Sequence, residues 1–393
     1  MNFDVIISGS GPAGSKSAEV LARNGFKVAL IEKNIDWRKP CGGALSARVM
    51  EKYFPQIRKL NPVIKTGAKL FSADFHLLEY NWKGYGENSI VIDRLEFDNL
   101  LREVAIDAGT ELFDKNLSYD FIIRNQKKVG IKTKTPSGIK EYLANIIIIA
   151  DGMSSKLAVK SGLRERWKIH DIALAKCSII ESESKLDIKK LYIYFRPYKG
   201  YGWVFPIDKK RVNIGCGTFE EDNLNFNLNK IYFEFINNPN IKNYFSKKQI
   251  KTIWTGSFPM SAKGVLEKSL YGDNIMIIGD AAGFVSPISG EGIHPSIVSG
   301  QAAAETAIQA LEREDFSKKV LKAYKMNSNI KKIISNFKLK RSLVNFFYEQ
   351  EGRNLNSMFK LAEEDEDFKT QVINMFFFKA TPSQDFFSKI RDY

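Results

Sequence analysis

The sequence predicts a mixed α/β (α+β) fold, and three observations support this prediction. A glycine-bearing turn, GSGPAG at Gly9–Gly14, separates a strand-like segment from a helix-like one, as in a Rossmann-type nucleotide-binding domain. Short β-type runs dominate from Asp171 to Ser257, which favours an antiparallel sheet. The chain after Asp315 has the apolar spacing of helices. A length of 393 residues suits two interleaved domains with an additional helical C-terminal region.

The first residues predict a βαβ unit. A buried strand is expected at Phe3–Ser8, a helix at Pro12–Asn24 and a second strand at Lys27–Ile31, which ends at Glu32. Because the connections are short, the two strands are expected to be neighbours in one parallel sheet.

The glycines of the turn have separate tasks. Gly9 permits the tight turn, Gly11 lets the backbone approach a pyrophosphate, and Gly14 lets the helix pack closely on the strand. The helix that begins at Pro12 and Ala13 offers free N–H groups and about half a positive charge to the phosphates. A chance glycine turn is the alternative, and the flanking strand and helix disfavour it.

An acidic residue ends the second expected strand. Glu32 stands 18 residues after Gly14 and is followed by Lys33. A carboxylate at this distance can accept a hydrogen bond from a ribose hydroxyl. It favours an unphosphorylated ribose, and therefore FAD or NAD rather than NADP.

Two later segments favour FAD over NAD. IIGDAAGFVSP at Ile277–Pro287 is expected to place Asp280 at the end of a buried strand, followed by small residues, Ala281 first, that open a helix. Such an acid can hold the ribityl chain while backbone N–H groups meet the pyrophosphate. The triplet Ala150–Gly152 also ends a strand with an acid and a glycine, and its alternative interpretation is a plain strand-end turn.

The remaining elements complete this outline. Apolar residues at helical spacing predict helices at Arg94–Ala108 and Glu291–Leu311. Alternating and continuous β-type runs predict three strands at Leu117–Arg124, Lys128–Thr135 and Ile139–Ile149.

Composition limits the class of protein. The hydrophobic content is 44%, and apolar stretches such as Ile146–Ala150 are far shorter than the roughly 20 residues that span a bilayer. The N-terminus lacks the features of an export signal. The three cysteines, Cys41, Cys177 and Cys216, are too few for a disulfide framework, which favours a cytoplasmic protein. The sequence has no Cys/His cluster with metal-ligand spacing, so no metal is expected.

The nucleotide-binding segments resemble a known flavoprotein fold. Together with IDRLEFDNLL at Ile92–Leu101, they resemble the glutathione-reductase-type FAD fold that flavoprotein aromatic hydroxylases and their relatives use. The resemblance covers roughly residues 1–170 and 270–315. It implies that Arg94 lies near the flavin side of FAD.

Further segments narrow the family. RKPCGG at Arg38–Gly43 follows the second strand, and YGWVFP at Tyr201–Pro206 is followed after eight residues by GCG at Gly215–Gly217. These segments, and Gly279–Gly300, resemble the geranylgeranyl reductase family, and within it the archaeal-type digeranylgeranylglycerophospholipid reductases. The aromatic hydroxylases more often have a histidine at the position of Gly283.

The resemblance implies a prenyl-binding wall in the antiparallel domain. Tyr201, Trp203 and Phe205 alternate, so their side chains share one face of a strand. Periodicity alone leaves open whether this face is plain core or one wall of an apolar cavity. The substrate contacts that the resemblance implies are Tyr201, Trp203, Phe205, Pro206, Gly215 and Gly217.

The predicted cofactor contacts come from six separate stretches of the chain. The residues expected to contact FAD are Gly9, Gly11, Pro12, Ala13, Gly14, Glu32, Lys33, Cys41, Gly42, Gly43, Arg94, Asp151, Gly152, Asp280, Ala281, Pro287, Gly290, Gly292 and Ile293. The catalytic candidates are Cys41, Tyr201 and His294, and the proton donor is not assigned among them. Cys41 is equally compatible with a small buried thiol, and His294 with a cap on its helix turn.

The predicted function is FAD-dependent reduction of isolated C=C bonds in geranylgeranyl chains of archaeal-type membrane lipids or their precursors. The reaction combines a hydride from N5 of the reduced flavin with a proton. One alternative is an FAD-dependent monooxygenase or hydroxylase that acts on an apolar substrate. A second alternative is a non-catalytic prenyl carrier.

The predicted domains are discontinuous in sequence. The FAD-binding domain is expected at residues 1–70, 92–170 and 271–315, the substrate domain at 71–91 and 171–270, and the helical region at 316–393.

The net charge of +14 is not distributed uniformly along the chain. Between Phe316 and Tyr348 there are nine Lys or Arg residues and no Asp or Glu. This segment predicts either peripheral docking on the anionic inner surface of a membrane or a solvated helical face. Nucleic acid is disfavoured because no recognition motif accompanies the charge.

No second dinucleotide motif is present in the sequence. The external electron donor is therefore expected to be NAD(P)H that binds transiently or a ferredoxin that docks on the basic surface.

Overall fold

The computed structural model describes residues 1–82, 88–196, 198–219, 227–245, 249–377 and 382–393. All of the expected site residues lie within these ranges. The chain forms two compact units, each built from three separate segments. The first unit contains residues 1–38, 95–168 and 258–338, and the second contains residues 39–94, 169–257 and 339–393.

A mixed sheet with a parallel centre lies at the core of the first unit. Its strands follow the order β17-β18-β11-β1-β2-β8, and β1 pairs in parallel with both β2 and β11. The predicted βαβ opening is therefore confirmed, with α1 (Pro12–Arg23) between the two strands. The strands are β1 (Asn2–Ser8), β2 (Val28–Ile31), β8 (Glu111–Phe113), β11 (Gly138–Ile149), β17 (Tyr271–Gly272) and β18 (Ile275–Ile277).

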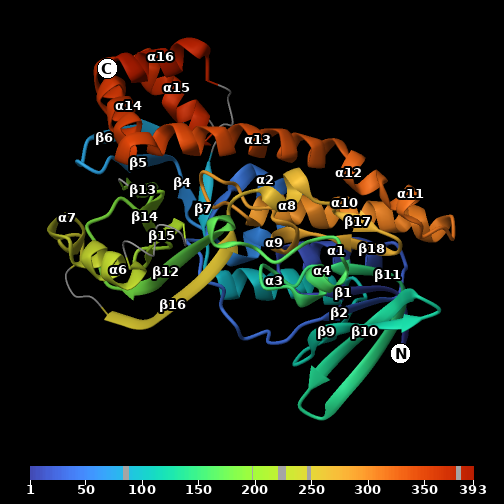
Figure 1. Cartoon of the computed structure of the whole chain (residues 1–393). Helices are drawn as coiled ribbons and strands as arrows, with labels where there is room; N and C mark the ends of the chain where they lie inside the picture. The colour runs from blue at the N-terminus through green and yellow to red at the C-terminus, as the bar shows by residue number, and fades with distance from the viewer. Residues whose placement is uncertain (83–87, 197, 220–226, 246–248, 378–381) are drawn as a thin grey trace. The chain divides into compact units, whose positions relative to one another are not determined.

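The three consecutive strands predicted before Ala150 are also present. β9 (Leu117–Arg124) and β10 (Lys127–Thr135) are antiparallel to one another, and β10 pairs with β11. Figure 1 shows β9 and β10 as a long hairpin that extends from the parallel sheet. β11 thus belongs to the parallel sheet at its C-terminal end and to the hairpin at its N-terminal end.

Helices cover this sheet. α1 and α10 pack on one another so closely that a Cβ on Gly300 would lie 2.2 Å from the Ala13 carbonyl oxygen. The predicted helix at Arg94–Ala108 is α3 (Arg94–Asp107). The other helices of this unit are α4 (Lys156–Lys160), α8 (Lys263–Glu267), α9 (Gly279–Ala282), α10 (Ile293–Glu312), α11 (Lys318–Leu321) and α12 (Ala323–Met326).

A seven-stranded sheet forms the centre of the second unit. Its order is β16-β12-β15-β14-β13-β5-β6. The neighbouring pairs around β14 and β15 are antiparallel, as predicted, whereas β13 pairs with β5 in parallel. The strands are β5 (Gly67–Phe71), β6 (Leu77–Asn81), β12 (Ile172–Glu181), β13 (Lys190–Phe195), β14 (Gly200–Pro206), β15 (Arg211–Phe219) and β16 (Gln249–Pro259).

One face of this sheet carries the core of the second unit. α6 (Leu228–Asn237) packs on it through Tyr232 and Phe235, which lie in one apolar cluster with Val204 and Ile214. Because side chains alternate along a strand, Trp203 and its neighbours of the same parity lie on the opposite face.

The second unit contains a further small sheet and short helices. Its strands are β3 (Ala44–Ser46), β7 (Ser89–Val91) and β4 (Ile64–Lys65), and its helices are α2 (Ala47–Tyr53), a 3-10 helix at Pro55–Leu60 and α7 (Pro239–Lys242). The C-terminal chain is helical as predicted, with α13 (Ser328–Tyr348), α14 (Arg353–Glu364), α15 (Glu366–Phe377) and α16 (Gln384–Asp392).

Candidate functional site

The turn after β1 needs glycine at its two ends. Gly9 has φ +102°, and a Cβ on it would lie 2.4 Å from the Ala150 carbonyl oxygen. A Cβ on Gly14 would lie 1.8 Å from the Gly9 carbonyl oxygen. A Cβ on Gly11, in contrast, would meet no described atom within 4 Å. The outer glycines are therefore required by close packing, while the space over Gly11 is open.

The helix that follows this turn begins without a side-chain cap. Gly11 is the N-cap residue of α1, and Pro12 occupies the first helical turn. The N–H groups of the first turn of a helix lack intrahelical acceptors, and the helix dipole adds partial positive charge there. The arrangement suits a pyrophosphate above Gly11.

The carboxylate of Glu32 is held by four donors. The backbone N–H and the hydroxyl of Ser10 donate to Oε2 at 2.9 and 3.0 Å. The backbone N–H groups of Lys33 and Asn34 donate to Oε1 at 2.9 and 3.1 Å. A carboxylate offers about four acceptor positions, and these four donors use all of them. A ribose hydroxyl can therefore donate to Glu32 only after the Ser10 hydroxyl, which rotates freely, has turned away.

Asp151 carries an unsatisfied buried oxygen. Its Oδ1 is shielded from solvent and has no hydrogen-bond partner among the described residues. Burial raises the pKa of this carboxyl to about 6, although the Ser155 hydroxyl and the charge of Arg164 act in the opposite direction. A buried acceptor without a donor is costly in a folded protein, so a ligand hydroxyl is the natural partner for it.

The three predicted nucleotide segments converge in the first unit. A Cβ on Gly9 would lie 2.7 Å from the Asp151 Cα, and a Cβ on Gly279 would lie 2.9 Å from the Ala13 Cβ. A Cβ on Gly292 would lie 3.2 Å from Oδ1 of Asp280. The open space at Gly11, the uncapped helix and the orphaned oxygen of Asp151 therefore fit the FAD that the sequence predicts.

Asp280 lies on a different element from the one predicted. β18 ends at Ile277, and Gly279 has φ +58° and turns the chain into α9, so Asp280 lies in the first turn of this short helix rather than at the end of a strand. Asp280 is buried, at 8% exposure. Its neighbours Ala281 and Pro287 are also buried, and Gly290 has φ +63°.

His294 is the second residue of α10, which begins at Ile293 after the N-cap residue Gly292. Its side chain is mostly buried, with Nδ1 3.7 Å from a carboxylate oxygen of Glu291. The imidazole thus lies between a helix N-terminus and a carboxylate.

Three of the predicted substrate residues, Tyr201, Trp203 and Phe205, form an aromatic row in the second unit, whereas Pro206 has the opposite parity on β14 and shares the face of Val204. The ring centroids of Tyr201 and Trp203 are 6.0 Å apart, and those of Trp203 and Phe205 are 6.3 Å apart. On the neighbouring strand, Gly217 pairs with Tyr201 and Gly215 pairs with Trp203. We call this face, made by Tyr201, Trp203, Phe205, Gly215 and Gly217, the aromatic wall.

The loop Cys41–Gly43 contacts the aromatic wall. A Cβ on Gly42 would lie 2.9 Å from the Phe205 ring and 3.1 Å from the Trp203 indole nitrogen. The Cys41 thiol is partly exposed and accepts a weak hydrogen bond from the Gly43 N–H at 3.4 Å. The second unit therefore brings together the two sequence segments that indicated the reductase family.

Comparison with known proteins identifies the family. The family model described as "FAD binding domain" matches residues 2–329. Digeranylgeranylglycerophospholipid reductase 1 of Methanopyrus kandleri is 30% identical over 334 residues, which is 82% of this chain and 85% of that protein. The chain belongs to the digeranylgeranylglycerophospholipid reductase family. The Thermoplasma acidophilum reductase of this name is 29% identical over 82% of both chains.

Solved structures agree with this assignment. A geranylgeranyl bacteriochlorophyll reductase-like protein from Thermoplasma acidophilum superposes with a TM-score of 0.83 and 26% identity over 95% of this chain and 96% of that one. A flavin-dependent brominase has a TM-score of 0.74, with 100% of this chain and 98% of that one covered, but at 19% identity the likeness extends to the fold alone. This member of the family is an FAD-dependent oxidoreductase, and the alternatives of a monooxygenase and of a non-catalytic carrier are less well supported.

Gly283 has a backbone conformation that a side chain would strain. Gly283 has φ +87°, and a Cβ on it would lie 3.1 Å from the Trp167 ring. Trp167 is itself fixed by the Arg164 guanidinium, 4.3 Å above its ring, and by an indole hydrogen bond to the Met153 carbonyl at 3.1 Å. A side chain at this position is therefore disfavoured by the backbone conformation and by close contact with the indole.

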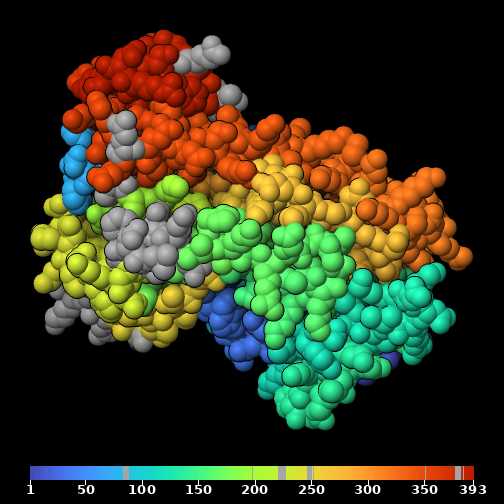
Figure 2. All heavy atoms as spheres, in the orientation of Figure 1, coloured from blue at the N-terminus to red at the C-terminus, as the bar shows by residue number. Residues whose placement is uncertain are grey.

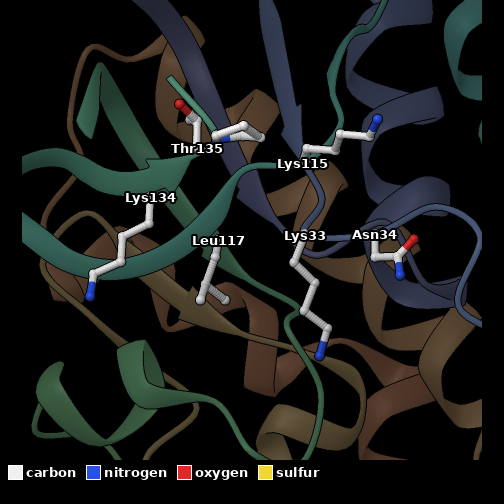
Figure 3. A pocket seen from close by; sticks show the side chains of 7 residues that line it. Lys33, Asn34, Lys115, Leu117, Lys134 and Thr135 are labelled. Carbon is white, nitrogen blue, oxygen red and sulfur yellow. The ribbon is translucent and has the colours of Figure 1, made fainter. Parts of the chain in front are cut away.

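The structure adds residues that sequence reasoning missed. A surface pocket of about 460 Å³ begins one residue after Glu32. Figure 3 shows that it is lined by three lysines from different segments, with Leu117 between two of them. Its lining residues are Lys33, Asn34, Lys115, Leu117, Lys134, Thr135 and Pro136. Only Lys33 was predicted, because the others lie on strand ends, loops and turns that carry no motif.

Two structural findings concern metals and membranes. Within the described ranges, no group of three or more His, Cys, Asp and Glu side chains is arranged to hold a metal ion. None of the helices in the described part of the chain combines the length and apolarity that crossing a bilayer requires.

Proposed function

We propose that this protein reduces isolated C=C bonds in the geranylgeranyl chains of archaeal-type membrane lipids or their precursors. The relatives that cover most of the chain are named for this reaction on digeranylgeranylglycerophospholipids. The more distant halogenases share the fold alone.

The aromatic wall is the observation that carries this proposal. Tyr201, Trp203 and Phe205 form one row of rings, of which Tyr201 is partly exposed, and glycines on β15 lie opposite Tyr201 and Trp203. A face of aromatic rings suits a hydrocarbon chain, which gains about 0.8 kcal/mol for each methylene that it buries. Recognition of chain length by this effect is graded rather than sharp.

The chemistry divides between the cofactor and the chain. Bound FAD, once reduced, supplies the hydride that an isolated alkene cannot obtain from any side chain. The chain supplies orientation, exclusion of water and a proton, so that the alkene gains two hydrogens in total. The proton can come from the Cys41 thiol, the Tyr201 hydroxyl, the His294 ring or an ordered water, and these four stay the candidates.

We infer that the adenosine end of FAD lies at the pocket of Figure 3. Glu32 accepts from backbone N–H groups at the edge of this pocket, and Lys33 and Lys115 provide positive charge beside it. The remaining predicted contacts in the first unit lie on the phosphate turn, at Asp151 and Gly152, and along α9 and the start of α10. Cys41, Gly42, Gly43 and Arg94 stay predicted flavin contacts.

The basic segment between Phe316 and Tyr348 is proposed to dock on an anionic membrane surface. Lys318, Lys319, Lys331 and Lys332 are exposed, whereas Lys340 is buried. On the face that Figure 2 shows, this orange segment lies at the surface. Such a position suits an enzyme whose substrate partitions strongly into the bilayer.

The electron donor is proposed to be NAD(P)H in transient contact, or a ferredoxin attracted by the net positive charge.

Mass spectrometry of lipids tests the function. The protein is expressed together with an archaeal-type pathway that makes unsaturated lipids, and the lipid extract is compared with that of cells without the protein. Mass gains in steps of two hydrogens support the proposal. A second measurement mixes the oxidised protein with NADPH, NADH, reduced ferredoxin or dithionite without oxygen. Failure of the flavin to bleach with every donor, or unchanged lipid masses with a reducible flavin, contradicts the proposal.

A further inference from the structure

A single buried amide joins the aromatic wall to the loop Cys41–Gly43. Asn213 lies on β15 and is completely buried. Its Oδ1 accepts from the Trp203 indole N–H at 2.9 Å, and its Nδ2 donates to the Cys41 carbonyl oxygen at 2.8 Å. An indole nitrogen can only donate and a carbonyl oxygen can only accept, so the chemistry of the partners fixes the orientation of the amide.

Asparagine is well suited to this position. The site needs one acceptor and one donor in a short planar side chain. An aspartate offers no donor to the Cys41 carbonyl at neutral pH, and a leucine of similar size leaves both partners unsatisfied in a buried place. Neither substitution preserves both bonds.

The loop that Asn213 holds fits tightly on its other sides as well. Gly42 leaves no room for a side chain beside Phe205 and Trp203. Gly43 has φ +75°, and a Cβ on it would lie 2.1 Å from the Ile92 carbonyl oxygen. The Ile92 N–H donates to the Gly43 carbonyl at 3.1 Å. The loop backbone is therefore held at Cys41 by an amide and at Gly43 by a neighbouring strand end.

We propose that Asn213 is a positioning residue that clamps the loop Cys41–Gly43 to the Trp203 indole. Through this clamp, the orientation of the indole and the position of the loop depend on one another. The catalytic consequence rests on the proposed function: a loosened loop lowers kcat for the prenyl lipid more than it raises KM, because the apolar chain still binds but is held less often in a reactive position.

The rate at which the Cys41 thiol is alkylated measures how firmly Asn213 holds the loop. Cys177 and Cys216 are fully buried, and burial raises the pKa of Cys216 to about 12. Cys41 is partly exposed, so a thiol reagent reaches it first in the folded protein. Alkylation by iodoacetamide of the purified FAD-loaded protein, without lipid, is followed by peptide mass spectrometry at each of the three cysteines.

Two variants and one control define the test. Asn213→Leu removes both bonds, and Asn213→Asp removes the donor to Cys41. The control is Ser178→Ala, which removes a buried 2.6 Å hydrogen bond to the Tyr232 hydroxyl on the opposite face of the same sheet. We expect Cys41 to react at least tenfold faster in both Asn213 variants and within twofold of the wild-type rate in the control.

The possible results distinguish loosening of this loop from unfolding of the whole protein. They also distinguish failure of the clamp proposal from failure of the proposed function. Selective acceleration at Cys41, with Cys177 and Cys216 unreactive, supports the clamp, whereas equal acceleration at all three cysteines shows global unfolding and overturns it. A wild-type rate at Cys41 in Asn213→Leu also overturns it; if that variant does not fold, Asn213→Asp decides alone. Because alkylation requires no lipid, a wild-type enzyme that reduces no lipid contradicts the proposed function and leaves this result intact.

Discussion

The Trp203 indole occupies the space in which a side chain at residue 215 would have to lie. A Cβ on Gly215 would come within 2.4 Å of the indole Cζ2 atom, 2.6 Å of the Lys176 carbonyl oxygen and 2.7 Å of the Cys177 Cβ. The two glycines of the GCG segment are therefore not equivalent. Gly217, the second, would place its Cβ 3.2 Å from the Leu174 carbonyl oxygen, with no ring in contact.

Gly215→Ala is expected to destabilise the protein by about 1–3 kcal/mol, the usual cost of overpacking a buried site. The new methyl group displaces the indole, so the wavelength and intensity of tryptophan fluorescence change as well. Gly217→Ala is the matched control, with a smaller loss of stability and little change in fluorescence. Urea unfolding and fluorescence spectra of both variants measure these effects, and equal losses in the two variants contradict the steric explanation.

Asp151→Asn is expected to stabilise the flavin-free protein at neutral pH. The pKa of the Asp151 carboxyl is raised from 3.8 to about 6 by burial, so its ionised form is disfavoured in the folded state. The stability of the wild type relative to the variant is therefore highest below pH about 4 and falls as the pH rises to about 6. At roughly 1.4 kcal/mol for each pKa unit, the difference reaches up to about 3 kcal/mol.

Urea unfolding of the flavin-free proteins at pH 4, 5, 6 and 8 measures this difference. Asp120→Asn gives the opposite trend, because the Lys160 ammonium holds the pKa of the Asp120 carboxyl below its usual range. That effect is small, since the Asp120–Lys160 pair is largely exposed. A difference between wild type and Asp151→Asn that does not change with pH is incompatible with a buried ionised carboxylate.

Gly11→Ala is expected to weaken FAD binding at least tenfold without lowering the stability of the flavin-free protein. The new Cβ meets no described atom within 4 Å, so the methyl group would clash only with a ligand bound above the turn. Gly14→Ala instead places a Cβ 1.8 Å from the Gly9 carbonyl oxygen and should prevent correct folding. Flavin fluorescence titration and thermal unfolding distinguish the two effects, and a normal FAD affinity in Gly11→Ala argues against a pyrophosphate at this turn.

Reversal of two charges in the basic segment is expected to weaken vesicle binding at least tenfold. Lys331→Glu with Lys332→Glu removes two exposed cations, each of which contributes about 1 kcal/mol near an anionic surface. Lys209→Glu with Lys210→Glu makes the same change in net charge at another exposed site and is the control. Flotation with anionic vesicles at low and high salt gives the comparison. Equal losses in the two double variants would mean that total charge, and not this segment, sets the affinity.

Local sequence signals predicted much of the fold. The βαβ opening, the three strands before Ala150 and the helix at Arg94 follow from periodicity and from turn residues, and the structure contains them. The location of Asp280 was not predictable, because the sequence does not show that Gly279 adopts a positive φ and begins a new short helix. The parallel pairing of β13 with β5 depends on segments more than 100 residues apart, which carry no shared motif.

Contacts between distant segments limited prediction of the site most strongly. Asn213 lies in no recognisable motif, and the sequence gives no sign that it differs from other strand residues. Its two partners lie 10 and 172 positions away, and neither separation corresponds to a local pattern. Asp151 was predicted from its position after a strand, but only the structure shows that one of its oxygens is buried without a partner.

The interleaved order of the two units affects how the protein is made. β1 is the first strand to leave the ribosome, but its neighbour β11 follows only at residue 138, and β18 extends the same sheet from residue 275. The seven-stranded sheet is likewise incomplete until β16 ends at Pro259. Neither unit can finish folding on a partly synthesised chain. We therefore expect the nascent protein to expose unpaired strand edges through much of translation, and the full chain to refold slowly after dilution from denaturant.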